Sequence, residues 1–136
     1  ALTMPFADAT FDRLVIGFST RNLTSLAEGL REMLRVLKPG GRLIVLETGW
    51  PAHPIRRSAY WLFLATVVRV VGLLVTGRVW PFTYLARSVR AFVTPAQFAA
   101  LLRDAGADVE YRALSGGLAS LYLATKAVAG GPGAGR

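Results

Sequence analysis

Two short apolar runs with an amphipathic segment between them limit most strongly what this chain can fold into. The run from Phe11 to Phe18 (FDRLVIGF) and the run from Arg42 to Thr48 (RLIVLET) are β-rich, and their centres are almost wholly apolar. Such runs are typical of strands that a parallel sheet buries on both faces. Between them, Ser25 and Glu28 have the spacing of a helix-capping box, and Lys38-Pro39-Gly40-Gly41 is predicted to end that helix. Strand, helix and strand in this order predict a βαβ unit.

The last third of the chain has the pattern of a helix followed by an antiparallel hairpin. Thr94 to Gln97 (TPAQ) combine a Thr cap, a Pro at the first helical position and a Gln that closes the capping box. Asp108 to Leu114 and Leu118 to Thr125 are predicted strands around the turn Ser115-Gly116-Gly117. The predicted fold class is therefore α/β, with parallel strands and crossover helices first and a closing antiparallel hairpin last. We expect one domain over residues 1–126 and a disordered tail over residues 127–136.

The segment from Ile55 to Val79 is long and apolar and is predicted to be helical. A membrane span is one interpretation, because Ala59 to Gly77 contains a single charged residue. That residue, Arg69, lies at the middle of the segment, where its insertion into a bilayer costs roughly 2.5–3.5 kcal/mol. The sequence therefore favours a buried or interfacial helix over a span.

The formal net charge is +8, and the acidic residues avoid the most apolar part of the chain. No Asp or Glu occurs between Glu47 and Asp104, whereas seven arginines do. A basic and apolar stretch fits an anionic membrane surface or an amphiphilic ligand, and no nucleic-acid reading motif is visible. The absence of cysteine, with His53 as the single histidine, indicates no metal site.

Five stretches resemble the ubiquinone/menaquinone C-methyltransferases, a family of class I S-adenosylmethionine-dependent methyltransferases. The most specific is Gly17 to Thr24 (GFSTRNLT), which is similar to the family's SFG-x-RN-x-T segment at the carboxyl end of its fourth strand. The others are Met4 to Asp12, Arg35 to Leu43 with Glu47, Tyr84 to Arg90, and Tyr111 to Gly117. Gly49 stands where the family signature has Ser, and Arg87 replaces an acidic residue. The resemblance covers residues 1–126 and implies the C-terminal half of a Rossmann-like class I methyltransferase fold.

The resemblance implies roles for seven residues in three groups. They are Arg21 and Asn22 in catalysis, Ala1, Gly17 and Phe18 at the cofactor, and Tyr60 and Tyr84 at the substrate. Arg21 is expected to stabilise phenolate charge on the acceptor, because a guanidinium stays protonated in proteins. The residues by themselves also allow Arg21 to be a surface arginine, and Asn22 or Thr24 to be a helix cap.

Three further groups of residues have two interpretations each. Gly17 and Phe18 either face the cofactor or form a closely packed strand end. Glu47 either orders the site or pairs with an arginine. Six aromatic residues either line an isoprenoid channel or form ordinary core: Tyr60, Trp61, Phe63, Trp80, Phe82 and Tyr84.

The function that the resemblance implies is C-methylation of a polyprenylated quinol with S-adenosylmethionine as methyl donor. We expect a cytoplasmic protein, peripheral to an anionic membrane, that does not bind nucleic acid. The glycine-rich turn and the acidic ribose partner of the cofactor are not in this sequence. The isolated chain is therefore expected to be inactive, and either to form homo-oligomers or to pair with a missing N-terminal half. Methyl transfer to another small or lipidic acceptor is one alternative, and a non-catalytic, membrane-interacting remnant is the other.

Overall fold

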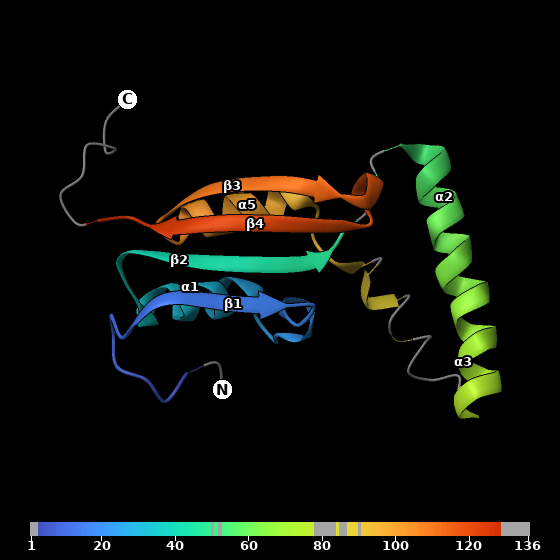
Figure 1. Ribbon diagram of the computed structural model, residues 1–136, viewed down its shortest axis with the longest axis horizontal. Helices are drawn as coiled ribbons and strands as arrows, with labels where there is room; N and C mark the ends of the chain where they lie inside the picture. The colour runs from blue at the N-terminus through green and yellow to red at the C-terminus, as the bar shows by residue number, and fades with distance from the viewer. Residues whose placement is uncertain are drawn as a thin grey trace.

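A mixed sheet with two helices against one face forms the body of the protein (Figure 1). The computed structural model describes residues 3–49, 51, 53–77, 84, 87–89 and 91–128. Within them the sheet has four strands in the order β1-β2-β4-β3. The strands are β1 (Phe11–Gly17), β2 (Leu37–Thr48), β3 (Ala107–Leu114) and β4 (Ala119–Lys126). β1 is parallel to β2, and β4 is antiparallel to both β2 and β3. The predicted order, a parallel βαβ unit followed by an antiparallel hairpin, is confirmed.

Helices α1 (Leu26–Val36) and α5 (Pro95–Asp104) pack on the same face of the sheet, behind it in Figure 1. The Ser25 hydroxyl accepts from the N–H of Glu28 at the start of α1. Thr94 and Gln97 form the complete predicted capping box at the start of α5. Because these caps use donors that would otherwise be unpaired, each helix begins where its sequence predicts.

The core lies between these two helices and the two central strands. It consists of the side chains that the helices and the strands point toward each other. The largest are Leu30, Leu34, Leu43, Val45, Phe98, Leu102 and Tyr122. Tyr122 stacks against Tyr111 on one side and contacts Phe98 on the other, with ring centroids 5.8 and 4.4 Å apart. Burial is the main cause that raises the pKa of Tyr122 to about 12.

The link between α1 and β2 differs from its predicted form. The predicted strand began at Arg42, but β2 begins at Leu37, directly after the helix. The pairing register moves from Phe11–Leu37 to Arg13–Arg42, so β2 advances five residues while β1 advances two. Gly40 takes up this bulge with a φ of +74°. The glycine pair therefore bends the edge of the sheet as well as ending the helix.

The other boundaries agree with the prediction to within one or two residues. β1 ends at Gly17, and the hairpin strands join through a short turn, η3 (Ser115–Gly117), whose three residues all have positive φ. The predicted tail lies outside the described residues from residue 129 onward.

A second region is a long helix that stands beyond the carboxyl ends of β1 and β2 (Figure 1). It consists of α2 (Pro54–Leu62), a π-helical turn η2 (Phe63–Val67) and α3 (Val68–Thr76), which we call the exposed helix. It has 23 residues, and its most apolar 18-residue window has a mean hydropathy of 1.9 and is only 6% buried. Of the two predicted forms, the buried helix is therefore wrong, because no other described element covers it, and the interfacial helix stays a prediction. By length and composition alone this helix could cross a membrane.

Candidate active site

The carboxyl ends of β1 and β2 lie side by side, because the two strands are parallel neighbours (Figure 1). The chain leaves β1 at Gly17 and turns sharply at Phe18, whose φ is +53°. The Phe18 N–H donates to the carbonyl of Leu46 at 2.8 Å, while its side chain stays 45% exposed. A left-handed φ strains a bulky residue by about 1–3 kcal/mol, and such residues cluster at functional sites. The turn presents an aromatic ring at the edge where open α/β sheets bind ligands.

A fully buried carboxylate, that of Glu47, joins the two strand ends. Its Oε1 accepts hydrogen bonds from the backbone N–H of Thr20 at 2.8 Å and from the Thr20 hydroxyl at 2.9 Å. Its Oε2 accepts from Nη1 of Arg21 at 3.3 Å and from the N–H of Thr48 at 3.0 Å. Glu47 therefore fills both of the roles that the sequence left open, since it orders the turn after β1 and pairs with an arginine.

Arg21 lies in the short helical turn η1 (Thr20–Asn22), and its side chain is only 13% exposed. The alternative of a surface arginine is therefore wrong. Its Nη1 is bound to Glu47, but its buried Nε has no hydrogen-bond partner among the described residues. A buried donor without a partner is uncommon and is typical of strained or functional sites. Glu47 thus holds in place a guanidinium, that of Arg21, which still has an unused hydrogen-bond donor.

Asn22 and Tyr84 meet beside this pair although they are 62 residues apart in the chain. The Tyr84 hydroxyl donates to Oδ1 of Asn22 at 3.0 Å. The alternative that Asn22 or Thr24 caps a helix is wrong, because Ser25 caps α1. Two residues that the resemblance assigned to catalysis and to substrate binding are therefore in direct contact.

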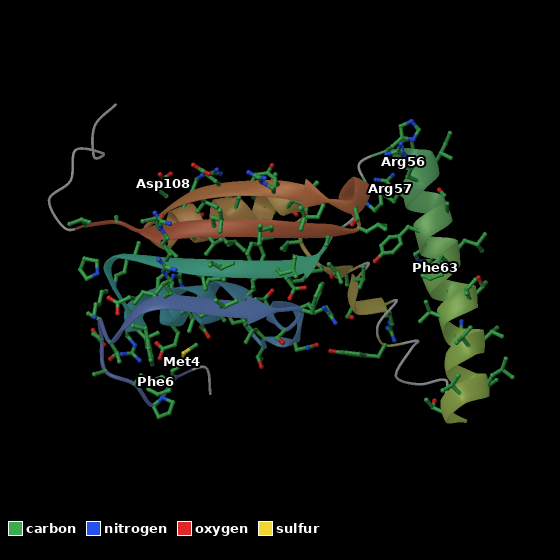
Figure 2. All side chains as sticks on the ribbon, in the orientation of Figure 1. Met4, Phe6, Arg56, Arg57, Phe63 and Asp108 are labelled. Carbon is green, nitrogen blue, oxygen red and sulfur yellow. The ribbon has the colours of Figure 1, made fainter. Side chains whose placement is uncertain are left out.

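An apolar cavity of about 540 Å³ opens between the start of the exposed helix and the β3–β4 turn. Its walls include Pro51, Arg56, Ala59, Tyr60, Phe63 and Leu118. Figure 2 shows Arg56 and Arg57 at the end of the helix nearest this turn. Burial raises the pKa of Tyr60, and the positive charge of Arg21 partly opposes that rise. The N–H of Gly49, two residues after Glu47, donates to the carbonyl of Leu118, and Leu118 and Pro51 are walls of the cavity. The cavity therefore lies at the same end of β2 as the Glu47–Arg21 pair.

The six aromatic residues predicted for an isoprenoid channel have different outcomes. Tyr60 and Phe63 line the cavity, Trp61 is absent from its walls, and Tyr84 lies at Asn22. The ordinary-core alternative is wrong for Tyr60 and Trp61, because α2 buries none of its residues. Trp80, Phe82 and the predicted cofactor residue Ala1 lie outside the described residues.

Gly49, the departure from the family signature, is required by the packing of this chain. A Cβ at this position would come within 2.2 Å of the Gly117 carbonyl oxygen. The end of β2 therefore passes directly against the β3–β4 turn, and Pro51 follows as a wall of the cavity. A serine here would push these two segments apart.

Sequence reasoning missed Thr20 as a site residue. Its side chain is almost fully buried, and both its backbone and its hydroxyl bind Glu47. The available signal was topological: parallel neighbouring strands end at the same edge, so a residue after β1 and an acid at the end of β2 are expected to meet. Among the described residues no group of three His, Cys, Asp or Glu side chains could hold a metal ion.

Comparison with known protein families agrees with this geometry. The family described as the ubiE/COQ5 methyltransferase family matches residues 1–126. The chain belongs to this family. The predicted recognition is thus confirmed, and so is methyltransferase as the protein class.

Curated members of the family match most of this chain. The demethylmenaquinone methyltransferase of Deinococcus radiodurans is 40% identical over 126 residues, which are 93% of this chain and 52% of the relative. The ubiquinone/menaquinone biosynthesis C-methyltransferase UbiE of Dinoroseobacter shibae is 41% identical over 127 residues, 93% of this chain and 51% of the relative. The chain spans about half the length of the curated relatives it matches.

Solved structures confirm the methyltransferase fold at low sequence identity. A methyltransferase of Thermotoga maritima, described as S-adenosylmethionine-dependent and as a possible histamine N-methyltransferase, superposes with a TM-score of 0.62. It is 18% identical, and the match covers 92% of this chain and 60% of that protein. The [4+2]-cyclase SpnF superposes with a TM-score of 0.61 at 19% identity, over 93% of this chain and 54% of that protein. These likenesses concern the fold alone, since the two proteins have different activities.

The family's cofactor is S-adenosylmethionine, and the residues at the end of β1 could border only part of it. A Cβ placed on Gly17 would meet no atom within 4 Å, so the space beside this strand end is open. The exposed Phe18 ring borders the same space. Within these 136 residues no glycine-rich turn follows a first strand, and no acidic residue is placed to hold the ribose. The alternative of a closely packed strand end is therefore wrong for Gly17, and the cofactor role of Gly17 and Phe18 stays a prediction.

Proposed function

We propose that residues 1–126 form the acceptor-binding half of an S-adenosylmethionine-dependent C-methyltransferase whose acceptor is a polyprenylated quinol. The observation behind the proposal is the Glu47–Arg21 pair beside the apolar cavity. A buried cation with a spare donor suits an oxygen that develops negative charge, and the cavity suits an apolar tail. The names of the curated relatives, which concern menaquinone and ubiquinone, support this class of acceptor.

Arg21 has an electrostatic role in this reaction. A quinol ring carbon becomes nucleophilic when a neighbouring hydroxyl loses its proton, so the site must stabilise phenolate charge. A guanidinium that is already fixed in place does so without reorganising at the moment of reaction. Asn22, held by Tyr84, adds an amide beside it for orienting the ring. When bound, S-adenosylmethionine supplies the electrophilic methyl group.

The cavity accounts for the first part of the isoprenoid tail. Its walls are mostly apolar, and Tyr60 and Phe63 contribute flat aromatic faces. The exposed helix continues this apolar surface away from the sheet, with large side chains turned to solvent along its whole length. A tail that leaves the cavity therefore passes directly onto an apolar helix.

Membrane docking through the exposed helix follows from the same acceptor. A polyprenyl tail leaves a bilayer only at a cost of roughly 0.8 kcal/mol per CH₂ group, so the enzyme must come to the membrane. We infer a peripheral position on the cytoplasmic side, with the helix at the interface, because Arg69 lies near its middle and would be buried in a span. Arg56 and Arg57 at its start are placed to meet anionic head groups (Figure 2).

The open edge of β1 is where the rest of a complete domain would pair. β1 has β2 as its only strand neighbour in the described sheet, and Val15 on it is 70% exposed. An unpaired parallel edge with an apolar residue is a template for another strand. We propose that this edge pairs with an N-terminal half like that of the longer relatives, and that in its absence two copies of the chain associate there.

A chimera tests the function directly. Residues 1–126 would follow the N-terminal half of the Deinococcus radiodurans relative, which supplies the part that this chain does not match. We expect the chimera to transfer a methyl group from S-adenosylmethionine to a polyprenylated demethylmenaquinol, measured by mass spectrometry of the product.

Three further acceptors complete the test. A demethylmenaquinol with a tail of one isoprene unit should be methylated with a much higher KM, because it leaves the cavity and the helix unused. Sterol and fatty acyl acceptors should give no product. Turnover of either of these, without turnover of the quinol, would contradict the proposed acceptor, and a chimera that binds cofactor but methylates nothing would favour the remnant.

A further inference from the structure

Glu47 is a buried carboxylate to which the proposed chemistry assigns no step. It is fully buried, and its two oxygens accept five hydrogen bonds. Three of these come from two consecutive residues, Thr20 and Arg21. The other two come from the backbone N–H and the hydroxyl of Thr48, its own neighbour on β2. Glu47 therefore binds the turn after β1 to the end of β2 at one point.

Glu47 accepts hydrogen bonds that the pairing of β1 with β2 does not require. The Phe18 N–H already continues the β1–β2 ladder by donating to the carbonyl of Leu46. Beyond that bond, the carboxylate fixes the backbone of Thr20, its hydroxyl and the tip of the following arginine. Because the residue before Arg21 and the guanidinium itself are both held, the side chain has little freedom to swing toward solvent. A buried carboxylate also compensates the charge of Arg21, which would otherwise be costly to keep in this place.

The way Arg21 is held leaves one of its buried donors without a partner among the described residues. Glu47 accepts from Nη1 alone, at 3.3 Å, rather than from both sides of the planar guanidinium. The buried Nε has no hydrogen-bond partner among the described residues. An arginine used only to stabilise the fold is expected to fill its donors with acceptors of the fold. The geometry instead keeps part of the guanidinium for another group.

We propose that Glu47 is a positioning residue for methyl transfer that acts through Arg21. This inference rests on the proposed function, in which Arg21 stabilises the phenolate of the acceptor. Glu47 holds the guanidinium at one place and in one orientation before the acceptor arrives, and touches neither acceptor nor cofactor. Preorganised charge of this kind stabilises a transition state more than a mobile charge does.

The kinetic test uses Glu47→Gln in the chimera described above. Gln keeps the size of the side chain and an acceptor oxygen for Thr20 but removes the negative charge. We expect kcat to fall roughly 10–10²-fold, the size typical of a misplaced reacting group, with the KM for S-adenosylmethionine changed less than about twofold. In the double variant with Arg21→Ala, the loss should equal that of Arg21→Ala alone, because Glu47 acts only through Arg21.

Ser120→Ala is the matched control. Ser120 is the cross-strand partner of Glu47 and is equally buried, and its hydroxyl forms no hydrogen bond with Arg21 in the described part of the chain. Its loss should leave kcat within about twofold of the parent. Thr20→Val serves as a milder variant if Glu47→Gln does not fold, and it should lower kcat in the same direction by a smaller factor.

A second measurement separates this inference from the proposed function. In the 136-residue chain, nuclear magnetic resonance can follow rotation about the Nε–Cζ bond of Arg21, which should be slow in the parent and in Ser120→Ala and fast in Glu47→Gln. If the chimera methylates nothing, the proposed function fails, while slow rotation that depends on Glu47 would still show that Glu47 holds Arg21. Unchanged rotation, or losses from Arg21→Ala and Glu47→Gln that multiply in the double variant, would overturn the positioning role.

Discussion

Two regions of the protein are strongly apolar: the sheet layer, formed by the sheet with α1 and α5, and the exposed helix. The sheet layer buries its apolar side chains, whereas the exposed helix leaves them in solvent. In the sheet layer, Leu43 and Val45 on β2 are fully buried against the helices. In the exposed helix, Leu74 is 79% exposed, and Gly72 is the only buried residue of α3. Helices cover one face of the sheet, whereas no described part of the protein covers the helix. Apolar composition therefore stabilises the fold in one region and leaves an exposed apolar surface in the other, to which we assign a lipid partner as a proposal.

The largest effect that separates the two regions is on stability. Leu43→Ala should lower the free energy of unfolding by about 2–5 kcal/mol, because it removes buried methyl groups and leaves a cavity. Leu74→Ala should change it by less than about 0.5 kcal/mol, since that side chain is already in solvent. Urea unfolding of both variants measures the difference. Equal losses would mean that the exposed helix is packed in solution and would break the comparison.

Two arginines test the same contrast in catalysis. Arg21→Ala should lower turnover of the chimera about 10²–10³-fold, and Arg21→Lys should restore only part, because the planar guanidinium is lost. Arg69→Ala is the matched change in the exposed helix, where, among the described residues, the side chain donates only to the carbonyl of Ala65 in its own helix. Its turnover on a detergent-solubilised quinol should stay within about twofold. Unchanged turnover in Arg21→Ala would contradict a role for the buried pair.

Lipid binding should depend on the exposed helix and on its charged start. We expect the chain to bind anionic vesicles and to lose most of this affinity by about 0.5 M salt, where the electrostatic screening length falls well below 10 Å. Replacing Arg56 and Arg57 by Glu should weaken binding, since each basic residue near an anionic surface contributes about 1 kcal/mol. The control is the pair Arg13→Glu and Arg42→Glu, which lies on the sheet. Equal affinity for neutral and anionic vesicles at every salt concentration would rule out the electrostatic part.

The smallest expected effect is that of low pH on stability, and it should arise in the sheet layer alone. Hydrogen bonds from Arg35 and from the backbone of Met4 lower the pKa of Glu32 to about 2. A lowered pKa stabilises the fold above the ordinary value near 4.5, and this contribution is lost as pH falls toward about 2. Glu32→Gln should therefore be less stable than the parent at pH 7 and equal to it near pH 2.

Urea unfolding at several pH values measures this convergence. The exposed helix contains no Asp or Glu, so its lipid binding has no carboxylate of its own to titrate. A stability gap between Glu32→Gln and the parent that stays constant down to pH 2 would assign the loss to packing instead of charge.

Local features of this fold could be predicted from the sequence because they depend on neighbours in the chain. The caps at Ser25 and Thr94, the two parallel strands and the antiparallel hairpin all appear where residue type and spacing predict them. The predicted burial of the first strand on both faces is wrong, because β1 has no buried residue and lies at the edge of the described sheet. The bulge after Val36 could not be predicted, because its form depends on the register that β1 imposes on β2.

The candidate site divides in the same way. The sequence by itself determined that Arg21 and Asn22 follow a strand end and that the apolar segment over residues 55–76 is helical. Only the tertiary structure decided that Arg21 is buried against Glu47, that Tyr84 reaches Asn22, and that the apolar helix has no cover. Periodicity reports which side chains share a face of one element. Whether another element covers that face depends on contacts between residues far apart in the chain, which periodicity does not contain.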